Sequence, residues 1–274
     1  MDNCKRSWGW MVQNLPRNKG DTLFSIPFEK SVLRRGYINE KESKTELAKR
    51  WLLLVAGLFV MALGVGFSIK ADLGTSPISS LPYTVSLVAP AVSVGTATII
   101  MHCVFIFLQL LLLRKDFGLS QLLQLPVALI FGWMTDLAVL LLGGVSGGSY
   151  IGQWLLCLIG VVLVALGVSA EVLAGVVTLA GEGLVLALCK VLPVKFGGMK
   201  VGFDLTLVIA SIILGLLAQG RVLGVREGTV AAALLVGLLS RQICRAVARY
   251  VALREKKPGF DEEAAAVEKK THTA

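Results

Sequence analysis

A few ionisable side chains interrupt otherwise apolar stretches of this sequence, and their chemistry is the first clue to a function. Asp204 lies near the start of one apolar run, Glu182 lies in a short Gly-punctuated stretch, and His102 lies near the middle of another run. An ionisable group at membrane depth is costly and indicates a functional site by default. Carboxyl groups also bind protons more readily in apolar surroundings than in water. We therefore expect proton coupling through Asp204, Glu182 or His102; the alternatives are an interfacial aspartate near a helix start and a structural histidine.

Two polar stretches follow long apolar runs and offer a place for a ligand. The first reads ADLGTSP at 71–77, where a Ser cap and a Pro in the first turn predict a short helix over 76–89. A helix of this kind extends ~18 Å, against a hydrocarbon core of ~30 Å. Irregular backbone at membrane depth survives only under protein or beside water, as at a transporter's binding site; the alternative is an extramembrane loop. The second stretch leads into another short helix ending near Pro193. Free backbone N–H groups at both helix starts favour substrate binding by nearby side chains: Asp72, Thr75, Ser76, Thr178 and Glu182.

The composition of the chain indicates the class of protein to which these residues belong. The chain is 55% hydrophobic and only 16% charged, with a mean hydropathy of +0.75, which is typical of an integral membrane protein. The net charge of +9 does not indicate nucleic acid, because the basic residues lie mainly in the tails and a few loops, where they orient the chain and meet anionic lipid. The five cysteines are scattered, without the spacing of a metal site, a redox motif or a disulfide framework.

The expected fold is an all-α polytopic membrane protein. Six spans are predicted, at about 51–69, 92–113, 119–142, 150–170, 201–219 and 228–243. Residues 1–50 contain eleven Lys/Arg against six Asp/Glu and lack the apolar core of a signal peptide, so they are interpreted as a cytoplasmic basic tail. Residues 251–274 are charged and Ala-rich and are interpreted as a disordered cytoplasmic tail.

The chain resembles itself at an offset of 103 residues. Without a gap, Thr75 aligns with Thr178, Pro90 with Pro193 and Gly95 with Gly198. With two residues of adjustment, Gly132 aligns with Gly237. Each half, 51–145 and 146–250, has the order span, short helix, span, span. We therefore predict two tandem membrane repeats, each with three transmembrane helices and one short re-entrant or broken helix.

Because each half has three spans, the second repeat must be inverted in the membrane, with both termini cytoplasmic. Six spans place Arg114 and Lys115 inside, the uncharged 143–149 loop outside, and Lys190, Lys195 and Lys200 inside, in agreement with the positive-inside rule. Arg221 and Arg226 face outward, which this topology does not explain. Inverted repeats with interrupted helices at matching positions are the sequence signature of a secondary transporter.

Two phrases resemble a known family. LGVG at 63–66 with ADLGTSP at 71–77 is similar to the first half of the YczE/YyaS/YitT-type bacterial membrane proteins. GVREGTV at 224–230 with ALLVG at 233–237 resembles a Gly-x-Gly-Thr…Ala-Leu-x-x-Gly phrase near the end of such proteins, although Glu227-Gly228-Thr229 departs from the simpler form. The resemblance covers about 50–250 and not the long tail before it. It implies a multi-pass protein of a bacterial plasma membrane that transports small molecules, and it assigns no binding or catalytic residue.

The sequence gives little support to an enzymatic function. Residues 144–147 match the Gly-x-Ser-Gly of rhomboid proteases, but a nucleophilic serine needs a base, and His102 and His272 are the only histidines of the chain. The sequence has no Walker motif, so we do not expect it to hydrolyse ATP. We expect neither catalytic residues nor a cofactor or metal.

The preferred hypothesis is a secondary transporter of a small polar solute, coupled to protons. Helix N-termini favour an acid end while Asp72 and Glu182 favour an amine, so an amine-bearing or zwitterionic solute fits better than a simple anion. Lys70 is the expected partner of Asp72. The alternative is a substrate-binding membrane subunit of an ATP-driven uptake complex. The expected partners are the solute and the bilayer; a homodimer or an energising subunit is left open.

Overall fold

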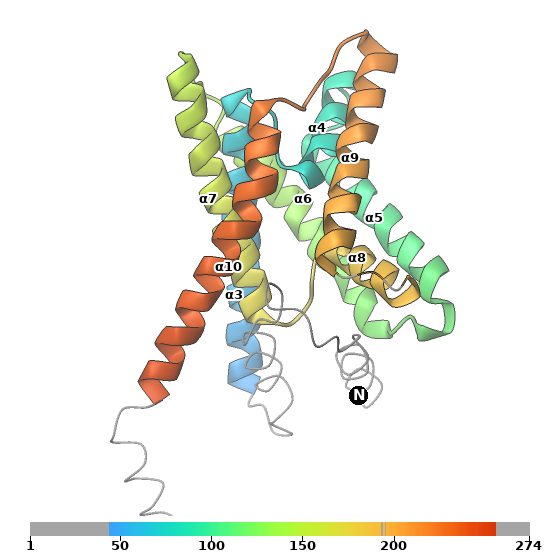
Figure 1. Cartoon of the computed structure of the whole chain (residues 1–274), viewed down its shortest axis with the longest axis vertical. Coiled ribbons are helices and arrows are strands. Elements are labelled where there is room, and N and C mark those ends of the chain that lie inside the picture. Colours follow the sequence, from blue (N-terminus) through green and yellow to red (C-terminus); the bar gives the residue numbers. More distant parts are fainter. Residues whose placement is uncertain (1–43, 193, 195, 256–274) are drawn as a thin grey trace, which may run out of the picture.

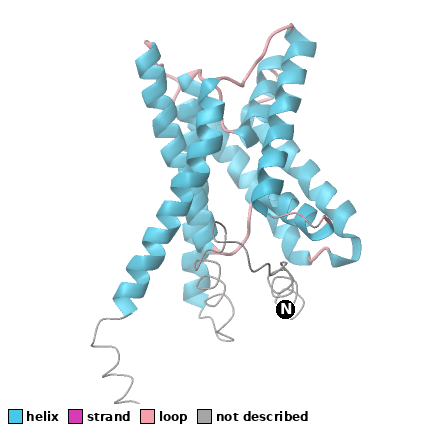
Figure 2. Ribbon diagram, viewed as in Figure 1, coloured by secondary structure: helices cyan, strands magenta, loops and turns pink. Residues whose placement is uncertain are grey.

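The computed structural model describes residues 44–192, 194 and 196–255, and every regular element in this part of the chain is helical (Figure 2). Six helices are long and apolar enough to span a bilayer, which confirms the all-α, six-span expectation. They are α3 (Lys44–Ala71), α5 (Val94–Leu113), α6 (Gln124–Leu141), α7 (Tyr150–Ala174), α9 (Phe196–Gln219) and α10 (Glu227–Glu255). Two helices of 12 residues, α4 (Pro77–Val88) and α8 (Ala180–Val191), interrupt this order.

Several helices extend beyond the expected spans. α3 begins at Lys44 rather than 51, α9 at Phe196 rather than 201, and α7 continues to Ala174 rather than 170. A helix satisfies its own backbone, so it continues into polar sequence until a cap ends it, as left-handed Gly175 does for α7. The remainder of the predicted tails, together with Pro193 and Lys195, lies outside the described residues.

Successive spans run in opposite directions, so the two ends of the molecule carry different segments (Figure 1). We call the end where α3 begins and α10 finishes the terminal side, and the end that carries residues 142–149 and 220–226 the loop side. α4 runs from the middle of the molecule to the loop side, and α8 runs from the middle toward the terminal side. At ~1.5 Å per residue neither short helix can cross a bilayer.

The chain reverses between α3 and α4 through two left-handed residues. Asp72 has φ 53° and Gly74 has φ 87°. A Cβ at Gly74 would also lie 2.6 Å from the amide nitrogen of Arg226, so glycine is required there by space as well as by conformation. Ser76 occupies the N-cap position and Pro77 the first turn, as predicted. However, the Ser76 hydroxyl donates to Ser79 Oγ at 3.1 Å instead of accepting a backbone N–H.

The helices pack in corresponding pairs around a central contact between α3 and α7. α3 packs against α6 and α7 against α10; α4 packs against α9 and α8 against α5. A buried apolar cluster at the centre includes Leu54, Val127 and Val164. The correspondence has one exception: α5 packs along α6, whereas α9 and α10 make no comparable contact and diverge from their connection on the loop side (Figure 1).

Helix bounds and close contacts repeat at the offset of 103 residues. Adding 103 to the bounds of α4 gives the bounds of α8, and α3 and α7 end at Ala71 and Ala174. At the α3–α7 crossing, a Cβ at Gly64 would lie 2.7 Å from the carbonyl oxygen of Gly160, and a Cβ at Gly167 would lie 2.7 Å from that of Gly57. Because 57 aligns with 160 and 64 with 167, these two contacts are exchanged when the halves are exchanged.

Candidate functional site

A cavity of about 470 Å³ lies at the centre of the molecule, and residues in or next to all eight α-helices of the described part line it. This volume is in the range of small-molecule sites. Seven aligned pairs contribute one residue from each half. They are Met61/Val164, Val65/Val168, Ser76/Leu179, Ser79/Glu182, Thr98/Val201, Met101/Asp204 and, at the adjusted offset, Phe131/Val236.

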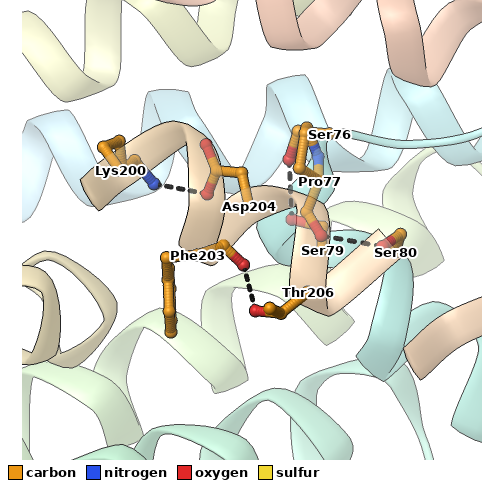
Figure 3. A network of polar contacts seen from close by, with 8 residues as sticks. All are labelled: Ser76, Pro77, Ser79, Ser80, Lys200, Phe203, Asp204 and Thr206. Carbon is orange, nitrogen blue, oxygen red and sulfur yellow. Dashed lines mark hydrogen bonds and ion pairs between the residues drawn. The ribbon is translucent and has the colours of Figure 1, made fainter. Parts of the chain in front are cut away.

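The start of α4 and one turn of α9 supply polar groups to this cavity. Ser76 and Ser79 lie at the start of α4, joined by their hydroxyl contact (Figure 3). On α9, Lys200 Nζ lies 2.8 Å from Asp204 Oδ1, an ion pair between side chains that are 27% and 24% exposed (Figure 3). Ser76 and Asp204 were predicted from the sequence; Lys200 was used there only as a marker of topology.

Glu171 is a cavity residue that was not among the predicted site residues. It comes directly after the predicted span at 150–170, but it lies one turn inside α7 and is only 1% exposed. Its Oε1 accepts the Leu179 backbone N–H at 2.7 Å, at the N-cap of α8, where negative charge is favourable. The Gly175 cap and the alignment of Glu171 with buried Ser68 were the signals that could have identified it.

Glu182 also lines the cavity, in the first turn of α8, as predicted. Desolvation raises the pKa of the Glu182 carboxyl; the Lys200 ammonium opposes this rise and the Asp204 carboxylate adds to it. Lys200 also acts electrostatically on Glu171. One ammonium is therefore shared by three carboxyl groups, while Arg241 and Arg245 line the cavity farther along α10.

His102 lines the cavity from α5 and is 1% exposed. Its ring meets those of Phe105 and Phe131 edge-on, with centroids 6.0 and 6.2 Å away. Its Nδ1 is one of three buried side-chain atoms in the described part that have no hydrogen-bond partner there. A buried polar atom in a cavity without a partner is available to a ligand or water.

The other predicted binding residues lie outside the cavity. Asp72 is exposed on the loop side, where Arg226 Nη1 donates to its backbone oxygen at 2.7 Å and lies 3.5 Å from its carboxylate. Arg226, rather than Lys70, is thus its ionic partner, which also accounts for a basic residue on this side. Thr75 is buried behind the lining, with its Oγ1 without a partner in the described part, and Thr178 is half-buried and away from it.

In the described part, backbone hydrogen bonds cover the cavity toward the loop side, whereas α9 and α10 lie apart toward the terminal side. Residues 71–77 and 224–230, the two segments that resemble the family, meet on the loop side of the cavity. The Gly228 N–H donates to Leu73 O at 2.8 Å, and the Thr75 N–H donates to Gly224 O at 3.3 Å. On the terminal side, the lining residues Phe196, Val201 and Arg245 are exposed to solvent or lipid, where α9 and α10 lie apart.

The serine of the Gly-x-Ser-Gly match and His102 lie apart in the described part. Ser146 of the Gly-x-Ser-Gly match is exposed on the loop side, whereas His102 is buried in the cavity. No group of three or more His, Cys, Asp or Glu side chains within residues 44–192, 194 and 196–255 could hold a metal ion.

Two comparisons of the sequence with known proteins find a match. A family model described as a family of unknown function, DUF6198, matches residues 48–245. The chain is also 27% identical over 199 residues to the uncharacterized membrane protein YczE of Bacillus subtilis (strain 168), covering 72% of this chain and 86% of that protein. No solved structure matches.

Proposed function

The chain belongs to this DUF6198 family of YczE-type membrane proteins, and we propose that it is a secondary transporter of a small polar solute, coupled to protons. One observation carries the proposal: a central cavity lined by aligned residues of both halves, covered on the loop side by backbone hydrogen bonds and bordered on the terminal side by α9 and α10, which lie apart in the described part. A site at mid-depth between two repeats, reached from one side at a time, is what alternating access requires.

The proposal treats residues 51–145 and 146–250 as inverted repeats. The identical offset of the short helices, the exchanged glycine contacts at the α3–α7 crossing and the paired helix contacts all support this arrangement. α4 and α8, which run to opposite sides from the middle, then correspond to the two half-helices that bring their N-termini to a transporter's site (Figure 1). We further propose a cell-membrane location with both termini cytoplasmic, so that the terminal side faces the cytoplasm.

An amine-bearing solute suits the charges of the cavity. Glu171 and Glu182 provide carboxylates at the start of α8, so they, rather than the exposed Asp72, are the expected partners of an amine. Arg241 and Arg245 could receive an acid end, so a zwitterion is accommodated too. The apolar remainder of the lining, such as Val65 and Phe131, limits hydration and strengthens such contacts.

Proton coupling is assigned to the carboxyl groups of the cavity, with Glu182 and Glu171 favoured over Asp204, whose charge Lys200 balances at 2.8 Å. A raised pKa lets Glu182 bind a proton from the acidic side and release it into a neutral compartment. One proton moving down a gradient of one pH unit is worth about 1.4 kcal/mol, or about tenfold accumulation of the solute.

In liposomes that hold only the purified protein, Glu182→Gln and Glu171→Gln are therefore expected to lose this tenfold, pH-driven accumulation. Solute exchange should persist at a higher solute concentration, which offsets the weaker contact with the amine. The solute would first be chosen by thermal-shift screening of small metabolites. Glu46→Gln, at an exposed surface carboxylate, is the matched control and should accumulate solute normally. Unchanged pH-driven uptake in both cavity variants would contradict proton coupling, and uptake only with an ATP-hydrolysing partner would favour the alternative of an ATP-driven complex.

Topology provides a separate prediction. In a background without the five native cysteines, Ser146→Cys is expected to react with an impermeant thiol reagent from outside the cell, and Lys115→Cys is not. Ser146 is exposed on the loop side, and Lys115 follows α5 on the terminal side. Labelling of Lys115→Cys from outside, with both termini inside, would support eight crossing segments and rule out the inverted repeat.

A further inference from the structure

The contact between α5 and α6 on the loop side depends on two glycines. A Cβ at Gly132 would lie 2.7 Å from the carbonyl oxygen of Gly95, and a Cβ at Gly95 would overlap the backbone of Gly132. The two helices can approach this closely only without side chains at these positions. Asp136, one turn along α6, secures the contact: it accepts from Ser93 Oγ at 2.6 Å and from the Gly95 amide at 2.7 Å.

The aligned glycines of the second half are Gly198 on α9 and Gly237 on α10, and they do not touch. A Cβ at Gly237 would meet no atom within 4 Å, and the nearest atom to a Cβ at Gly198 is a Val194 methyl at 3.9 Å. Both glycines border the terminal-side opening: Gly237 lines the cavity, as does Gly197 beside Gly198. Gly198 and Gly237 thus lie on two helices that border the same opening, and they do not form the close contact that Gly95 and Gly132 form.

We propose that Gly198 and Gly237 form the terminal-side gate of the cavity, which closes by bringing α10 onto α9 in the way that α6 now lies on α5. The inference rests on the proposed transport function, because it assigns the present arrangement to one of two states. In the other state Gly95 and Gly132 separate, the cavity opens to the loop side, and Gly198 and Gly237 come into backbone contact. The second state is obtained when each repeat adopts the conformation that the other repeat has in the first state.

The two gates differ in the charge that secures them. Asp136 places a carboxylate on the free amides at the start of α5, which is favourable at a helix N-terminus. Its aligned residue in α10 is Arg241, which has no acceptor to offer the start of α9. The loop-side contact therefore has a carboxylate–amide interaction that Arg241 cannot reproduce at the start of α9, and the terminal-side gate is the one found open.

Gly237→Leu tests the gate without requiring transport. The side chain has open space in the present state, so the variant should fold with an unchanged Tm; in the closed state it would overlap α9. Overpacking of this kind should reduce the closed population about 10- to 100-fold. Leu238→Phe, at a neighbouring residue that is 56% exposed, is the matched control.

The readout is the separation of spin labels at Val201→Cys and Ser240→Cys, one on each side of the opening, in protein without native cysteines and in lipid nanodiscs from acidic to alkaline pH. The parent and the Leu238→Phe variant should show a long and a short separation, and Gly237→Leu only the long one. A single separation in the parent at every pH, or a short one that persists in Gly237→Leu, would overturn the gate. The transport proposal itself stands or falls separately, on uptake by the parent protein.

Discussion

Gly160→Leu is expected to leave almost no folded protein. The α3–α7 crossing is the central contact of the molecule, and it is made by backbone against backbone. A Cβ at Gly160 would lie 2.8 Å from the carbonyl oxygen of Gly64 and 3.0 Å from the amide nitrogen of Ser68. The Ser68 hydroxyl, at 2.5 Å, could rotate away, but the carbonyl and the amide belong to the backbone and cannot. The cost should therefore exceed the ~3 kcal/mol typical of overpacking, out of a total stability of about 5–15 kcal/mol.

The measurement is the yield of monodisperse protein from detergent extracts, followed by Tm. Gly64→Leu, the other member of this contact, should fail in the same way, and Gly160→Ala should be milder but still lower the Tm. Gly202→Leu is the control, since a Cβ there meets no atom within 4 Å although the residue is also helical. Normal yield and Tm for Gly160→Leu would show that α3 and α7 do not cross at these glycines.

Lys200→Met is expected to have the next largest effect, because it leaves three carboxyl groups in one cavity without their shared ammonium. Breaking a fully buried pair costs about 3–5 kcal/mol, and partial exposure of 27% and 24% reduces this to about 1–3 kcal/mol. Glu171 and Glu182, on which Lys200 also acts electrostatically, add to the repulsion. The loss should shrink as the pH falls, because burial raises the pKa of the Glu182 carboxyl and its protonation removes part of the charge that Lys200 balanced.

Thermal unfolding across pH tests this account. Adding Asp204→Asn to Lys200→Met should restore part of the lost Tm, since one of the unbalanced charges is then gone. Lys49→Met breaks an exposed lysine–glutamate pair on α3 and should leave the Tm unchanged. If the double variant is less stable than Lys200→Met alone, repulsion among the carboxyl groups is not the cause, and Lys200 acts through its packing, such as its contact with the Phe203 ring at 5.8 Å.

Much of the site could be predicted from the sequence, and the exceptions are informative. Ser76, Glu182, Asp204 and His102 line one cavity because each interrupts an apolar stretch, where a polar residue needs protein or water around it. Asp72 interrupts the pattern as well, yet it lies at a helix end, where solvent and Arg226 satisfy it. Glu171 was missed because α7 continues one turn past the apolar run that was used to place its end.

The sequence by itself determined the six spans, the two short helices and the offset of 103 that relates them. Hydropathy and helix caps depend on neighbouring residues in the chain, and the offset appears when the sequence is aligned with itself. Only the tertiary structure decided that Glu171 and Lys200 join the cavity and that Thr178 does not, because which face of a helix is covered depends on its neighbours. It also decided that Gly95 meets Gly132 while Gly198 and Gly237 stay apart. Gly95 aligns with Gly198 and Gly132 with Gly237, so the presence of glycine does not decide which of the two pairs meets; that depends on how the helices pack in the folded molecule.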